Sequence, residues 1–274
     1  MGARQSAEHP SGKPLRVSAS DDDQAIYALL SRDRIYSAYA ICDLEADCRQ
    51  RSRFLVAEDD HVMLGLWLFF GLHDAAAAFA LGEPDALKTI LEQAPELPDL
   101  IWFGVRDEHL AALSMRYSFP QPMAMKRMFT SAEWFRPAPG EVTRLGSDHL
   151  AVIEDLYRHH AKAHFSADQV TSGVYYGAWR GSQLVSIAGT HCLSPTHGIA
   201  CVGNIFTCAG HRGQGLASAC TSAVVAELLP GFPEVVLNVH ADNPPAVHLY
   251  EKLGFRDHCF YREGRATLLL GRAR

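Results

Sequence analysis

An apolar segment from Ile199 to Thr207 runs directly into the glycine-rich stretch CAGHRGQGLASAC, residues 208–220. Its composition predicts a strand, and the apolar positions after it have helical spacing, at Leu216, Ala219, Cys220, Ala223, Val224 and Leu228. A helix that begins after glycines presents unpaired backbone N–H groups and the positive end of its dipole, which suits a phosphate. By spacing alone, an anion site and a plain strand-to-helix turn are equally good interpretations.

Two well-known phosphate motifs do not fit this stretch. Gly210 and Gly215 have the spacing of a P-loop, but Leu216 and Ala217 stand where Lys and Ser or Thr are required. Gly213 and Gly215 fit the start of a dinucleotide fingerprint, but Ser218 takes the place of its third glycine. Neither a nucleoside triphosphate nor a dinucleotide is therefore predicted.

The rest of the chain alternates between strand and helix patterns, which predicts an α/β protein. A polar segment, residues 1–14, is expected to be a disordered tail. We place a domain boundary in the proline-containing segment 119–140, which divides the chain into an N-terminal α/β domain, residues 15–135, and a second domain, residues 136–274. The first domain repeats the rhythm of the second but lacks the glycine-rich turn, so it is interpreted as a degenerate duplicate. The chain is expected to finish with one or two strands, around Cys259–Arg262 and Ala266–Leu270.

Composition excludes several classes of partner. The net charge is −6, and no basic stripe with interleaved aromatics is present, so no nucleic acid is expected. The apolar run from Val62 to Leu81 has membrane-spanning length, but His73 and Asp74 lie within it, which favours two strands and no membrane association. Seven scattered cysteines without a CxxC pair indicate free thiols in a cytoplasmic protein.

Two further motifs carry a resemblance to a known family. Arg212-Gly-Gln-Gly215-Leu-Ala217 fits the pattern R/Q-x-x-G-x-G/A, and Asn243, Ala246, Tyr250 and Gly254-Phe255 follow downstream at the spacing of a second signature. The pair resembles the cofactor signatures of the GNAT superfamily of acyl-CoA-dependent N-acyltransferases. The resemblance covers about residues 140–274, including the predicted hairpin YYGAWRGSQLVSIAGTHC.

The resemblance implies a GNAT fold, with a mixed, mostly antiparallel sheet flanked by helices, and acetyl-CoA (coenzyme A) as donor substrate. The N-terminal domain would be a second lobe, GNAT-like or otherwise α/β. No metal is expected, because His160 and His164 have metal-binding spacing but lack the HExxH glutamate. The residues implied to bind the cofactor are Ile205, Phe206, Thr207, Arg212, Gly213, Gln214, Gly215, Leu216, Ala217, Asn243 and Tyr250.

The resemblance also implies catalytic roles. Tyr250 would protonate the departing thiolate or donate a hydrogen bond to it; an ordinary phenol makes full proton transfer uphill by about 2 kcal/mol. Asn204 stands where many family members carry an acid, and it could orient a water or the acceptor but cannot act as a base. Candidates for the base are therefore His191, His240, Asp242 or an ordered water.

The two-lobe plan resembles the glycine N-acyltransferase group, which suggests a small-molecule amine or amino acid as acceptor. The acceptor site is expected near Tyr157–Val170 and the N-terminal domain. A homodimer is considered as the assembly. The competing interpretation is a non-catalytic sensor that binds acyl-CoA, favoured by Asn204 in place of an acid.

Overall fold

The computed structural model describes residues 14–71, 75–158 and 165–269, and its contacts divide the chain into two compact units. Unit 1 contains the chain up to Met125 together with residues from Phe260 onward, and unit 2 contains Lys126–Cys259. The division therefore lies ten residues before the predicted boundary at 135, and the end of the chain returns to the first unit. The predicted tail, apart from Pro14, lies outside the described residues.

A similar order of strands and helices occurs twice along the chain. The first series consists of β1 (Arg16–Ser20), α1 (Asp23–Leu30), a 3₁₀ turn (Ser31–Asp33), α2 (Ala38–Cys42), α3 (Ala46–Arg49), β2 (Ser52–Asp59), β3 (Val62–Phe70), β4 (Ala76–Gly82), α4 (Pro84–Gln93), β5 (Leu100–Val105), a 3₁₀ turn (Asp107–His109), α5 (Leu110–Ser114), β6 (Tyr117–Ser118) and β7 (Met123–Thr130). The second series consists of β8 (Thr143–Leu145), a 3₁₀ turn (Ser147–His149), α6 (Leu150–Arg158), α7 (Ala167–Ser172), β9 (Tyr175–Arg180), β10 (Gln183–Ser194), β11 (Ile199–Thr207), a 3₁₀ turn (Ala209–His211), α8 (Leu216–Leu228), β12 (Glu234–His240), α9 (Pro244–Lys252) and β13 (Arg256–Leu268). The order of the main strands and helices is thus similar in the two series, although α3 and β6 have no counterpart in the second.

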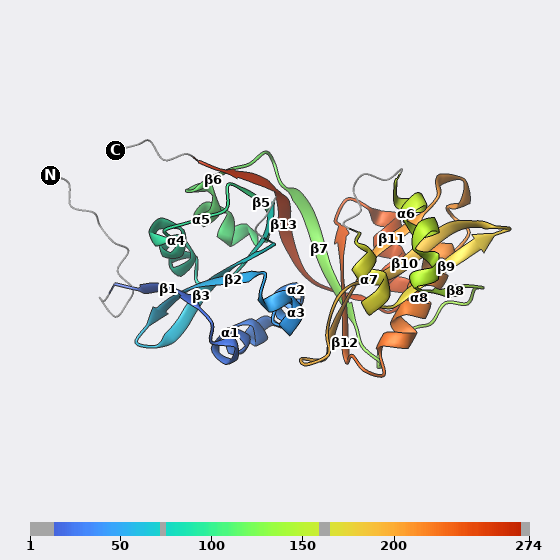
Figure 1. Cartoon of the computed structure of the whole chain (residues 1–274), viewed down its shortest axis with the longest axis horizontal. Helices are drawn as coiled ribbons and strands as arrows, with labels where there is room; N and C mark the ends of the chain where they lie inside the picture. Colours follow the sequence, from blue (N-terminus) through green and yellow to red (C-terminus); the bar gives the residue numbers. More distant parts are fainter. Residues whose placement is uncertain (1–13, 72–74, 159–164, 270–274) are drawn as a thin grey trace. The chain divides into compact units, whose positions relative to one another are not determined.

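The final strand of each series lies in the other unit's sheet (Figure 1). In unit 1 the strand order is β1-β2-β3-β4-β5-β13, and β13 pairs antiparallel with β5 from Arg262–Val105 to Thr267–Leu100. In unit 2 the order is β7-β12-β11-β10-β9-β8. This exchange explains why a linear pattern misplaces the boundary: β7 follows the first series in the sequence but completes the second sheet.

Each unit has its own apolar core. In unit 1, α4 and α5 pack with the sheet around Trp67, Phe69 and Phe103. In unit 2, alternate residues of β10 belong to different clusters, so the helices cover both faces: Val185 and Ala188 pack toward α8 and α9, whereas Leu184 and Ile187 pack toward α6 and α7.

The predicted fold class is confirmed. Both sheets are mostly antiparallel, and the parallel pairs are β4–β5 and β11–β12. The apolar run from Val62 to Leu81 forms β3 and most of β4, with the predicted joint at residues 72–74 outside the described part. Among the described helices none is long and apolar enough to cross a membrane. Of the one or two strands expected at the chain end, the structure has one continuous strand, β13.

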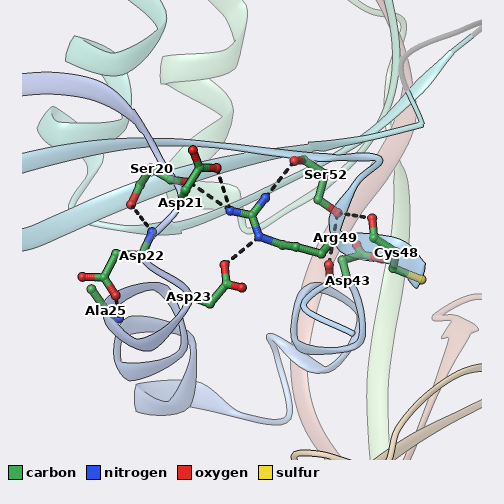
Figure 2. Close-up of polar contacts among 9 residues, drawn as sticks. All are labelled: Ser20, Asp21, Asp22, Asp23, Ala25, Asp43, Cys48, Arg49 and Ser52. Atoms are coloured by element: carbon green, nitrogen blue, oxygen red, sulfur yellow. Dashed lines mark hydrogen bonds and ion pairs between the residues drawn. The ribbon is translucent and has the colours of Figure 1, made fainter. Parts of the chain in front are cut away.

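The acidic start of α1 in unit 1 is held by Arg49, at the end of α3 (Figure 2). The Arg49 guanidinium donates to the carboxylates of Asp23 at 2.6 Å and Asp21 at 3.0 Å, and to the backbone carbonyls of Ser20 at 3.2 Å and Ser52 at 3.1 Å. Asp22 caps α1 by accepting from the Ala25 N–H. The acidic residues 21–23 therefore have a structural role: through Arg49 they connect the end of β1 and the start of α1 with β2.

Gly254, the C′ residue after α9, offers a sharp test of the unit 2 packing. Its φ is +88°, and an added Cβ would lie 1.9 Å from the Trp134 carbonyl oxygen. Gly254→Ala should lower the free energy of unfolding by about 3 kcal/mol, from left-handed strain plus the backbone clash. Gly181→Ala is the matched control, because Gly181 has φ +58° but open space around it, and it should cost only about 1 kcal/mol. Equal losses in chemical denaturation would show that the clash is relieved at no cost.

Candidate active site

The parallel strands β11 and β12 of unit 2 separate partway along their length. They pair only from Ile199–Glu234 to Val202–Leu237, although β11 continues to Thr207 and β12 to His240. Beyond Val202 the facing backbone groups of the two strands are not joined in a ladder. An extended ligand can therefore hydrogen-bond to the predicted segment Ile205–Thr207 as an added strand would.

Two bulges lie beside this opening. Between the pairs Ile187–Phe206 and Gly189–Gly203, β11 has one residue more than β10, and Asn204 in this bulge has φ +53°. Between the pairs Thr190–Val202 and Cys192–Cys201, β10 has the extra residue, His191. Bulges re-aim side chains and are common next to active sites. An asparagine tolerates the left-handed conformation better than most residues, which accounts for Asn204 here.

Asn204 is held by polar contacts from both sides. Its Nδ2 donates to Gln169 Oε1 at 3.0 Å and to the Tyr175 hydroxyl at 2.7 Å, and its backbone carbonyl accepts from the Tyr157 hydroxyl. Tyr175 donates onward to the Thr190 carbonyl at 2.9 Å. Both amide hydrogens of Asn204 are thus used, which leaves Oδ1 as the atom of this side chain that can meet a water or an acceptor.

The neighbouring tyrosines are unsuited to act as bases. Burial raises the pKa of Tyr157 well above its ordinary value, and burial raises the pKa of Tyr175 to about 12 against a smaller opposing effect of the Asn204 hydrogen bond. Of the predicted base candidates, His191 is half-buried on the β10 bulge, whereas His240 and Asp242 are exposed. The predicted metal-spaced pair His160 and His164 lies outside the described residues.

The glycine-rich stretch forms an open loop at the start of α8. Gly213 and Gly215 have φ of +77° and +76°, and no atom lies within 4 Å of a Cβ placed on either. Gly215 is the N-cap of α8. The backbone N–H groups of Leu216, Ala217 and Ser218 therefore have no acceptor within the helix. Arg212 is exposed and donates to the Thr207 carbonyl at 3.3 Å, while Gln214 accepts from Arg180 at 3.4 Å. The loop therefore has the backbone, the dipole and the cation of an anion site.

Helix α9 supplies the remaining predicted residues. Asn243 is its N-cap and accepts from the Ala246 N–H at 3.3 Å. Tyr250 is 7% exposed and belongs to the same apolar cluster as Val202 of β11, Leu237 of β12 and Leu216 of α8. Burial raises the pKa of the Tyr250 phenol above its ordinary value of about 10. Tyr250 therefore has a proton-retaining hydroxyl and belongs to the apolar core that β11, β12 and α8 share.

The corresponding opening in unit 1 is filled by a side chain. Strands β4 and β5 also pair over four residues, from Ala76–Ile101 to Phe79–Gly104. Just beyond, the fully buried Tyr36 hydroxyl donates to the Ala80 carbonyl and accepts from the Arg106 N–H, both at 3.1 Å. One phenol thus occupies hydrogen-bonding positions on both diverging segments.

The loop of unit 1 is closed as well. Helix α4 has Glu83 as N-cap, Pro84 at its first position and Asp85 in its first turn, so carboxylates occupy the positive helix end and one amide is missing. An added Cβ on Gly82 would lie 2.3 Å from the Leu64 carbonyl oxygen, so the backbone before α4 packs directly against β3, unlike the open loop of unit 2. The sequence signal for this closure, Glu-Pro-Asp, is visible without the structure.

Sequence reasoning missed three side chains that hold Asn204: Tyr157, Gln169 and Tyr175. Tyr157 and Gln169 lie within the segment predicted near the acceptor, but neither was assigned a role. Ser166-Ala-Asp-Gln169 has the spacing of a capping box, which is a local signal for Gln169. Nothing local marks Tyr175, because its partners come from distant strands.

Comparison with known proteins agrees with this geometry. No curated protein matches the sequence. Among solved structures, a Drosophila protein superposes with a TM-score of 0.70 at 16% identity, covering 94% of this chain and 99% of the other. A GCN5-related N-acetyltransferase from Kribbella flavida gives 0.60 at 17%, with 87% and 95% covered, and a tandem GNAT protein from the clavulanic acid biosynthesis pathway gives 0.53 at 14%, with 93% and 98% covered. These likenesses concern the fold.

The sequence pattern described as the acetyltransferase (GNAT) family matches residues 133–255, the region that contains the separating strands, the glycine loop and α9. The match covers less than half of the chain, and over residues 133–255 the chain is similar to the GNAT family of acetyltransferases.

Proposed function

We propose that this protein transfers the acetyl group of acetyl-CoA directly to the primary amine of a small molecule or amino acid in the cytoplasm. The observation that carries the proposal is the opening between β11 and β12 beside the open loop Gly213–Gly215. An anion site beside a β11 segment that is not paired with β12 suits a molecule with a pyrophosphate and an extended amide-containing arm.

Each predicted residue has a role in this proposal. The amides from Arg212 to Ala217 and the Arg212 guanidinium hold the pyrophosphate, and the backbone of Ile205, Phe206 and Thr207 pairs with the arm. Asn243 contacts the cofactor in addition to capping α9. The acceptor amine, once deprotonated, attacks the thioester carbonyl, and Tyr250 donates a hydrogen bond to the departing sulfur. Asn204 Oδ1 orients the acceptor or a water.

Thiol release is the direct test. Purified protein is incubated with acetyl-CoA and a panel of amines and amino acids, and free thiol is followed with time. Amine-dependent release with an acetylated product supports the proposal. Tight binding of acetyl-CoA without release across the panel would instead establish the competing sensor function.

The loop can be tested by a pair of glycine substitutions. Gly215→Ala forces a left-handed Cβ into the N-cap, and we expect coenzyme A affinity to fall about tenfold, equivalent to about 1.4 kcal/mol. Gly210→Ala is the control, because Gly210 lies in the same loop with open space and no positive φ.

Titration calorimetry with coenzyme A should give one binding site per chain, since Tyr36 and the Glu83–Asp85 turn close unit 1. Two equivalent sites would contradict that closure.

Tyr250→Phe tests the role of the phenol. We expect kcat to fall about tenfold, the cost of one hydrogen bond of about 1.4 kcal/mol at the leaving sulfur, with coenzyme A affinity changed less than twofold. Because burial raises the Tyr250 pKa, the hydroxyl stays protonated, and the loss should be the same factor at pH 7, 8 and 9. Tyr176→Phe, on β9, is the control. A loss that shrinks steadily as pH rises would instead identify a titrating acid.

A further inference from the structure

One side-chain amide in unit 2 joins three elements of the acceptor side. Gln169 lies in the first turn of α7, and its Oε1 accepts from the Ser166 N–H at 3.1 Å and from Asn204 Nδ2 at 3.0 Å. Its Nε2 donates to the His191 carbonyl at 3.0 Å and lies 3.5 Å from His191 Nδ1. Gln169 therefore caps α7 and at the same time connects the bulged residue of β10 with the bulge of β11.

The two bulged residues meet at the mouth of the strand opening. Gly203 follows Val202, the last β11 residue paired with β12, and it precedes Asn204. An added Cβ on Gly203 would lie 3.3 Å from His191 Cβ and 3.8 Å from His191 Nδ1, so the His191 side chain covers this glycine. The carboxamide of Asn204 and the imidazole of His191 thus flank the point where the strands part.

A bulge leaves backbone groups off the regular ladder and permits more than one side-chain direction. Here the off-ladder carbonyl of His191 is satisfied by Gln169, and the orientation of the Asn204 amide is set between Gln169 and Tyr175. Tyr175 approaches Asn204 from β9 and Gln169 approaches from α7, so removing either leaves one amide hydrogen of Asn204 without its present acceptor. The hydrogen bonds of Gln169 thus connect His191 in one bulge with Asn204 in the other.

We propose that Gln169 is a positioning residue for the acceptor half of the reaction: it fixes Asn204 Oδ1 and the His191 ring relative to the β11–β12 opening, where the acceptor amine must approach. This proposal rests on the acyl transfer proposed above. It assigns Gln169 no contact with the pyrophosphate loop, so its influence should fall on the acceptor and not on coenzyme A.

The first experiment compares Gln169→Ala with Thr171→Ala, an exposed substitution in the same helix whose hydroxyl contacts only the Asp168 carbonyl among the described residues. Because misplacement of about 1 Å costs on the order of 100-fold in rate, Gln169→Ala should lower kcat/KM for the acceptor by about 30- to 100-fold. The dissociation constant of coenzyme A should change less than twofold, and Thr171→Ala should match wild type in both. Unchanged kcat/KM overturns the proposal, and so does an equal loss of coenzyme A affinity, which would indicate general disruption.

A double-mutant cycle then tests the link to Asn204. If Gln169 acts through Asn204, adding Gln169→Ala to Asn204→Ala should cost much less than the 30- to 100-fold seen in the wild-type background. If the losses in kcat/KM of the two single variants multiply in the double variant, Gln169 does not act through Asn204.

A third readout does not depend on turnover. The side-chain amide signals of Asn204 in ¹⁵N spectra should exchange slowly with solvent in wild type and faster in Gln169→Ala; identical exchange overturns the inference. A wild-type protein that releases no thiol with any amine refutes the proposed function itself, which distinguishes the two failures.

Discussion

The architecture of both units depends on a parallel strand pair that stops after four residue pairs. Backbone groups beyond such a stop must find other partners, since each buried unsatisfied group costs about 1–3 kcal/mol. Unit 1 meets this demand internally, with the Tyr36 hydroxyl on Ala80 and Arg106. Unit 2 keeps the separation open beside a loop of left-handed glycines. The same backbone geometry therefore gives a separation closed by a side chain in unit 1 and an open separation in unit 2.

The closed lobe is stabilised by more than one contact around Tyr36. The Tyr36 ring lies 4.9 Å from that of Phe79, the Arg106 guanidinium lies 4.1 Å above the Tyr36 ring, and Arg106 also pairs with Asp33. Of these residues, Asp33 and Tyr36 lie in the segment between α1 and α2. In unit 2, the flanking elements α6 and α7 instead direct Tyr157 and Gln169 to the edge of the opening, where they hold Asn204.

Features set by neighbouring residues were predictable from the sequence, and features set by distant strands were not. The glycine loop, the Asn243 cap and the C′ position of Gly254 depend on a few consecutive residues, and the structure has each where it was expected. The bulges at His191 and Asn204 depend on the relative register of β10 and β11, which no periodicity encodes. The role of Tyr36 could not be predicted either, because its hydrogen-bond partners Ala80 and Arg106 are far away in sequence. The division between the two units also differs from the predicted boundary because β7 and β13 pair with strands that are distant in sequence.

The exchange of final strands has a consequence for biosynthesis. Trp102 of β5 donates to Glu263 of β13, a partner 161 positions later in the chain. As the ribosome extends the chain, the edge of β5 in the first unit therefore stays uncovered until β13 has been synthesised. Non-local strand pairing of this kind is slow to form, and an open edge invites pairing with other chains. The nascent protein is thus most vulnerable to aggregation before β13 has emerged, and the pairing of β13 with β5 is the event that completes the first unit's sheet.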